Sequence, residues 1–177
     1  MMMMEKKTMD EFKEFYHFGK DILSHPKFQE QRQFIHHKTI TLYDHSIEVA
    51  FRAYLVAKKL KLDTKAVVRG ALLHDFFLYD WHVEGKKKHK SLFKKHGFTH
   101  ARVACDNAEQ YFDLTRKEKD IIIKHMFPLN IRPPRYLESW VVNFIDDYTS
   151  IREVFPRKKK GAMTIHEYVS QQLKKSP

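Results

Sequence analysis

Cysteine, glycine and proline are scarce in this chain of 177 residues, which contains 1, 5 and 6 of them. The single cysteine, Cys105, excludes an intramolecular disulfide framework and a cysteine-based zinc site. The chain is rich in Lys, Glu and Leu and has few helix-breaking residues, and this composition is typical of helical proteins. We therefore predict the all-α class, with a single domain over residues 1–177.

Long apolar runs and several familiar motifs are also missing. No segment reaches the roughly 20 consecutive apolar residues of a membrane-spanning helix. Residues 1–10 are polar and charged after an initial run of Met, without the apolar core of an export signal. The sequence has no P-loop, no Gly-rich dinucleotide turn and no HExxH helix. We expect a cytoplasmic protein that does not act at a membrane.

Acidic residues are fewer than basic ones, and the formal net charge is +11. Lysines cluster between Lys86 and Lys95, and a second cluster spans Arg157 to Lys160. Such patches attract phosphate-bearing ligands, although solvated loops often carry similar charge. Neither cluster has the interleaved aromatic residues of a single-strand binding surface. Nucleic acid is therefore not the favoured partner, and the role of the Lys86–Lys95 segment stays open.

Apolar residues recur at helical spacing in several stretches separated by polar turns. Asp44 is expected to cap one helix, and Thr115 with Glu118 has the form of a capping box. No stretch shows the alternation of a half-buried strand. The predicted helices cover residues 9–23, 45–60, about 64–77, 100–112 and 138–154, and further helices begin near residues 115 and 164.

The pair His74-Asp75 is the most informative feature of the sequence. A lone His-Asp pair is weak evidence, but further histidines and a late aspartate lie near or within the predicted helices. Imidazole and carboxylate bind divalent first-row metals where no thiolate is present, and helical bundles build metal sites from inward-pointing side chains. Asp146 lies among apolar residues, where an unpaired carboxylate costs several kcal/mol. The candidate metal ligands are His45, His74, Asp75, His100, His125 and Asp146.

These residues, in this order, resemble the H…HD…D signature of the HD-domain metal-dependent phosphohydrolase superfamily. The resemblance rests on residues 43–46, 72–75 and 146, covers about residues 40–152 and implies an HD-domain helical bundle. It also implies that His45, His74, Asp75 and Asp146 hold one metal ion. His100 and His125 fall where two-metal members have additional histidines, so by resemblance Asp75 bridges to a second ion held by these two residues.

Within that superfamily, the pattern is similar to the symmetrical bacterial diadenosine tetraphosphate hydrolases. The stretch from His74 to Trp81 resembles a group of small, uncharacterised bacterial HD proteins. Phe77 and Leu78 stand where subgroups with an HD-Ile-Gly-Lys stretch have Gly and Lys. This departure disfavours a cyclic-dinucleotide phosphodiesterase of that type.

The predicted activity is hydrolysis of a phosphate ester or anhydride of a nucleotide or another small phosphorylated metabolite by a metal-activated hydroxide. His74 and Asp75 are the predicted catalytic residues, and Arg102, Lys124 and His96 are candidates for binding the substrate phosphate. Two divalent ions are expected, with iron or manganese favoured and zinc or magnesium left open. A di-iron oxygenase and a non-catalytic nucleic-acid-binding module are the alternatives. The sequence leaves the substrate and the oligomeric state open.

Overall fold

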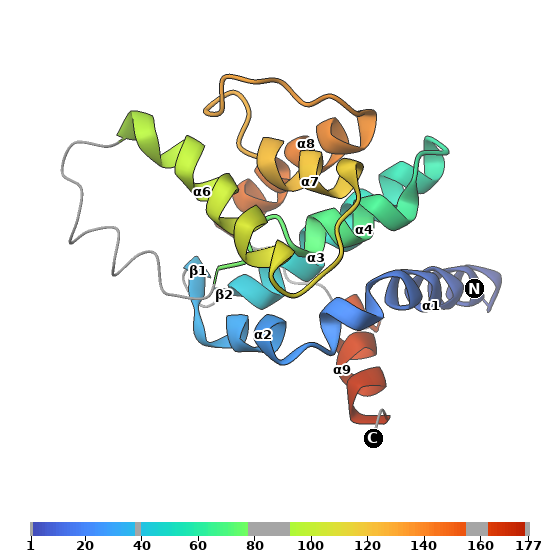
Figure 1. The fold of residues 1–177 in the computed structure, drawn as a ribbon. Coiled ribbons are helices and arrows are strands. Elements are labelled where there is room, and N and C mark those ends of the chain that lie inside the picture. Colours follow the sequence, from blue (N-terminus) through green and yellow to red (C-terminus); the bar gives the residue numbers. More distant parts are fainter. Residues whose placement is uncertain (1, 38–39, 78–92, 155–162, 176–177) are drawn as a thin grey trace.

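The computed structural model describes residues 2–37, 40–77, 93–154 and 163–175, except the side chains of 2–5, 36–37 and 93–99. The described residues form a bundle of helices, as the sequence predicts (Figure 1). The longer helices are α1 (Met2–Leu23), α3 (Leu42–Lys59), α4 (Thr64–Leu72), α6 (Phe93–Glu109), α7 (Arg116–Lys124), α8 (Leu137–Val154) and α9 (Ile165–Lys175). Two short helical turns, α2 (Pro26–Gln29) and η1 (Glu30–Gln33), follow α1.

A small hairpin was not expected from the sequence. Strands β1 (Ile35–His37) and β2 (Ile40–Thr41) pair in antiparallel fashion, with Ile35 opposite Thr41. These strands are too short to show the alternation by which a strand is recognised in a sequence. They lead the chain into α3, and the all-α class is confirmed.

Side-chain caps explain where several helices begin. Thr41, and not Asp44, caps α3, since its hydroxyl accepts a hydrogen bond from the Asp44 amide at 3.1 Å. The helix therefore starts at Leu42, three residues before the predicted start at position 45. The predicted capping box of α7 is confirmed, because Thr115 and Glu118 exchange hydrogen bonds of 3.2 and 2.6 Å.

Two other helix boundaries differ from prediction in places that matter for function. Helix α4 ends at Leu72, so His74 and Asp75 lie in a turn just beyond it and not on the helix itself. Helix α6 begins at Phe93, so His100 lies well inside this helix and not at its start.

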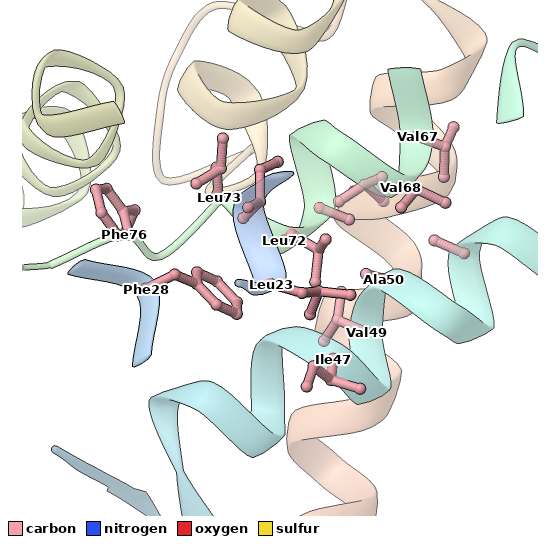
Figure 2. Packing of buried hydrophobic residues seen from close by; sticks show 14 of the residues in the cluster. Leu23, Phe28, Ile47, Val49, Ala50, Val67, Val68, Leu72, Leu73 and Phe76 are labelled. Carbon is pink, nitrogen blue, oxygen red and sulfur yellow. The ribbon is translucent and has the colours of Figure 1, made fainter. Parts of the chain in front are cut away.

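The hydrophobic core lies between the central helices and their neighbours. In Figure 1, α3 and α4 lie at the centre, with α7 and α8 on one side and α1 and α9 on the other. Figure 2 shows Leu72 of α4 meeting Leu23 of α1 and Ala50 of α3, and all three are fully buried. Gly70 allows α4 to approach α7 closely, since a Cβ atom here would lie 2.9 Å from Ile121.

Charged groups link three of these helices beside the core. Arg69 of α4 binds Asp21 of α1 at 2.6 Å and Glu118 of α7 at 2.8 Å. The same three side chains line a surface hollow of about 470 Å³, and none of the described residues in its walls is a predicted metal ligand. Among the described residues, no helix is both long and apolar enough to cross a membrane.

Candidate metal centre

The structure brings all six predicted metal ligands together from five segments of the chain. They form two neighbouring groups, and within each group the ligand atoms lie within 4.8 Å of one another. The first group contains His45 of α3, His74 of the turn after α4 and Asp146 of α8. The second contains Asp75 of the same turn, His100 of α6 and His125, which caps the C-terminus of α7.

The first group surrounds one carboxylate oxygen. Asp146 Oδ1 lies 3.0 Å from His45 Nε2 and 3.6 Å from His74 Nε2. Both imidazoles are fully buried, and the Asp146 side chain is 13% exposed. Helix α8 thus presents Asp146 toward the interior, where a carboxylate without a partner would be costly and where the two imidazoles lie beside it.

The second group surrounds Asp75. Its Oδ1 lies 3.0 Å from His100 Nε2 and 3.2 Å from His125 Nε2. The other oxygen, Oδ2, lies 3.6 Å from His74 Nε2 in the first group. One carboxylate therefore faces both groups, each with a different oxygen, which is the arrangement of a bridging ligand between two ions.

Backbone carbonyls fix the orientation of two of the histidine rings. Nδ1 of His74 donates to the Ala71 carbonyl and Nδ1 of His125 donates to the Ile122 carbonyl, each at 2.7 Å. With the proton on Nδ1, the neutral ring carries a lone pair on Nε2. Both Nε2 atoms are buried, and neither has a hydrogen-bond partner among the residues that the structure describes.

These unpartnered nitrogens show that the residues fit a metal ion. In the neutral rings each lone pair faces carboxylate oxygens, which are also acceptors, so burying them together is unfavourable unless a cation, either a metal ion or a proton on Nε2, lies between them. Ligand atoms about 2.0–2.2 Å from a shared ion lie roughly 3–3.5 Å from one another. The distances between nitrogen and oxygen ligand atoms within each group, 3.0 to 3.6 Å, are close to that spacing.

The carboxylates of the centre are held in the ionised form. Burial opposes ionisation of Asp146, but His74 and the hydrogen bond from His45 hold its pKa well below its usual range. Burial likewise opposes ionisation of Asp75, and the surrounding histidines keep its pKa low. Burial alone lowers the pKa of His45, whereas hydrogen bonds to Asp146 and a second carboxylate raise it to about 10. The ionised carboxylates therefore favour binding of a cation at the centre. A metal ion bound to His45 Nε2 would displace the proton from that nitrogen.

Glu153 is the second carboxylate, and it is not among the site residues predicted from the sequence. Its two oxygens lie 3.0 and 3.1 Å from His45 Nδ1, and its side chain is only 8% exposed. Histidines that bind metals commonly donate their other N–H to a carboxylate, which fixes the ring and raises its basicity. The signal was available, since Glu153 follows Asp146 by seven residues, two helical turns along the same face of α8.

Three amide side chains, also missed, hold the backbone beside the ligands. Gln31 donates to the Asp75 carbonyl at 2.9 Å, and Asn107 donates to the Phe76 carbonyl at 3.1 Å. Asn143 of α8 donates to the Phe127 carbonyl at 2.9 Å and also to the carbonyl of His125. No spacing pattern in the sequence could have identified these residues.

The predicted substrate-binding residues lie apart from the two groups or outside the described part. Arg102 is largely exposed and pairs with Asp106 on its own helix at 3.2 Å. Lys124 is half-buried, donates to the Arg132 carbonyl at 3.1 Å and has a pKa lowered by burial. Neither side chain contacts a predicted ligand in the part of the chain that the structure describes. The side chain of His96 and most of the Lys86–Lys95 segment lie outside the described residues.

Comparison with known proteins identifies one family. The family model described as HD domain matches residues 42–167, more than two-thirds of the chain and a range that includes all six ligands and Glu153. No curated protein and no solved structure matches the chain. The matched range extends 15 residues beyond position 152, to which the sequence resemblance reached, and takes in Glu153 and the start of α9.

Proposed function

The chain belongs to the HD-domain family, and from this premise we propose that it is a metal-dependent phosphohydrolase. Its substrate would be a phosphate ester or anhydride of a nucleotide or another small phosphorylated metabolite. The observation that carries this proposal is the position of Asp75, whose two oxygens face two separate histidine groups. A carboxylate in that position suits a pair of ions acting on one phosphoryl group.

The residues divide into two sets of ligands. His45, His74 and Asp146 would hold one ion, His100 and His125 would hold the other, and Asp75 would contact both. When bound, two such ions lower the pKa of a water molecule and neutralise charge on the attacking and leaving oxygens. The donor set of imidazole and carboxylate suits iron or manganese, and leaves zinc and magnesium open.

The charge of the centre favours an anionic substrate. Asp75, Asp146 and Glu153 supply three negative charges, against four positive charges from two dications, which leaves about +1 with neutral histidines. The most exposed ligands are His100 at 16% and Asp146 at 13%. We expect the phosphoryl group to approach from the side of these two residues, while the buried imidazoles exclude water from the opposite side.

Phosphate release by the metal-loaded full-length protein tests this proposal. The chain is stripped with a chelator, reloaded separately with Mn²⁺, Fe²⁺, Zn²⁺ or Mg²⁺, and assayed on nucleoside phosphates and dinucleoside polyphosphates. Asp75→Ala should lose activity and most of the bound metal. The matched control is Asp147→Asn, because Asp147 is an exposed carboxylate of α8.

Three results would contradict the proposal. The first is an Asp75→Ala variant that stays active and fully loaded with metal. The second is oxygen uptake together with a mixed-valence iron signal in electron paramagnetic resonance and no phosphate release, which would indicate a di-iron oxygenase. The third is salt-sensitive nucleic-acid binding, without hydrolysis, that persists in a His74→Ala/Asp75→Ala variant and would indicate a binding module.

A further inference from the structure

The outward face of α8 exposes a stripe of large apolar side chains. Leu137, Phe144 and Ile151 are 67%, 62% and 63% exposed, and Tyr148 is 45% exposed. The partly buried Trp140 joins them, since its ring stacks on Phe144 with centroids 5.7 Å apart. The opposite face of α8 packs against α3 and α7. Large apolar residues at this spacing on an outer helix face indicate a contact surface.

The spacing of this α8 stripe is symmetric about its middle residue. Leu137 and Ile151 each lie seven residues from Phe144, and Trp140 and Tyr148 each lie four residues from it. A two-fold symmetric contact requires one surface to be complementary to a copy of itself. A second α8 running antiparallel would place Phe144 against its own copy, Leu137 against Ile151 and Trp140 against Tyr148. We propose that the chain forms a homodimer through this face of α8.

The exposed area is sufficient for such a dimer. If each residue offers roughly 200 Å² in all, the four most exposed side chains present on the order of 500 Å² of mainly apolar surface. A standard interface buries about 800 Å² per partner, of which about 65% is apolar in homodimers, or roughly 520 Å². The stripe therefore supplies the apolar part of an interface of ordinary size.

The charges beside the stripe are compatible with the antiparallel pairing. Asp147 lies three residues from Phe144, so the two copies of Asp147 would be about 9 Å apart along the helix axes. That separation is about one Debye length at physiological ionic strength, so salt weakens their repulsion. Asp147 borders the stripe on one side, and Arg52 and Arg152 border it at Tyr148, where their guanidinium carbons lie 5.8 and 5.7 Å from the ring centroid. A chain that instead used this face to bind a membrane surface, as basic-bordered apolar helices do, would sediment as a monomer in the test below.

The proposed interface lies on the helix that also carries part of the metal centre. Asp146 and Glu153 project from the inner face of α8, and the stripe occupies the outer face. Pairing of two α8 helices would therefore restrain the helix that positions these two carboxylates. The dimer proposal does not depend on the proposed hydrolase activity.

Sedimentation velocity of the full-length protein tests the dimer. The wild-type chain should sediment as a dimer at tens of micromolar, and Phe144→Glu should raise the dissociation constant roughly 30-fold or more, since it places two like charges at the symmetry axis. The matched control is Leu60→Glu, an equally exposed apolar residue at the end of α3, which should leave the dimer intact. A monomeric wild-type chain, or a Phe144→Glu variant that remains dimeric, overturns the proposal.

A cross-linking experiment tests the pairing independently of stability. In a Cys105→Ala background, Phe144→Cys should form a covalent dimer on mild oxidation, because the two thiols would meet at the two-fold axis. Leu60→Cys in the same background should remain uncross-linked. Equal cross-linking of both variants, or none for Phe144→Cys in a chain that is dimeric, overturns the antiparallel pairing of α8.

Discussion

Replacing Glu153 by Gln removes one charge beside His45 while keeping the length and shape of the side chain. The carboxylate accepts a hydrogen bond of 3.0 Å from His45 Nδ1, and its 8% exposure means that little solvent screens the contact. Hydrogen bonds to charged groups contribute about 1.5–3 kcal/mol, and neutral ones about 0.5–1.5 kcal/mol. The substitution should therefore weaken metal binding through His45 by about 1–1.5 kcal/mol, roughly 5- to 12-fold.

Competition with a chromogenic chelator measures this change directly. The stripped protein is titrated with Mn²⁺ or Co²⁺, and the dissociation constants of the first and second ions are fitted separately. Only the ion held by His45, His74 and Asp146 should bind more weakly in Glu153→Gln. The absorption spectrum of bound Co²⁺ should shift as well, because the electron donation of one ligand has changed.

Asp147→Asn is the matched control for charge. It removes one negative charge from the same helix; burial and the neighbouring Asp146 raise the pKa of Asp147, but its exposed side chain lets solvent weaken its field at the centre more than that of the buried Glu153. We expect less than about a 2-fold change in either dissociation constant. Equal weakening by the two substitutions would refute the argument, since it would show that Glu153 acts only through general charge. An unchanged constant in Glu153→Gln would refute it too.

Three further outcomes follow from the contacts described above. His100→Ala should lower the bound metal from two ions to about one, measured by elemental analysis, because one ligand of the second group is lost. His166 lies 3.5 Å from Asp44 and Glu48; burial lowers its pKa, but these carboxylates raise it to about 9, from 6.5. The contribution of protonated His166 to the stability of the fold is complete below pH 6.5 and is lost as the pH rises to 9. Urea unfolding should therefore show that the free energy of unfolding falls by about 1–3 kcal/mol over this range, and His166→Gln should not show this fall. Gly70→Ala should destabilise the fold by about 1–3 kcal/mol in the same assay, because its Cβ would lie 2.9 Å from a side chain of α7.

The parts of the fold that depend on local periodicity could be predicted from the sequence. Helices α3, α7 and α8 lie where the apolar spacing and the Thr115 capping box indicate. The superfamily resemblance is confirmed by the family match, because the order of histidine and aspartate along the chain is itself the signature. Close likeness to small bacterial HD proteins and the roles of the individual ligands stay predictions.

Contacts between distant segments account for what could not be predicted. Glu153 is separated from its partner His45 by 108 residues, so their pairing depends on how α8 packs on α3. Val142 and Phe144 are both among the apolar neighbours of Asp146 in the sequence, and a helix that is apolar on several sides does not reveal which side is buried. The structure puts Val142 inside and Phe144 outside.

The early end of α4 shows why the His-Asp pair depends on residues far from it. On a continuous helix, His74 and Asp75 would diverge by about 100°, so they could not both face one centre. In the turn after Leu72 the His74 ring and the Asp75 carboxylate approach to 3.6 Å. Where a helix ends, the last backbone carbonyls lose their hydrogen bonds within the helix, and buried carbonyls then need hydrogen-bond donors from elsewhere in the protein. Gln31 donates to the Asp75 carbonyl and Asn107 donates to the Phe76 carbonyl, so these amides stabilise the turn. The sequence gives no local sign of this turn, because residues 71–77 contain no glycine or proline.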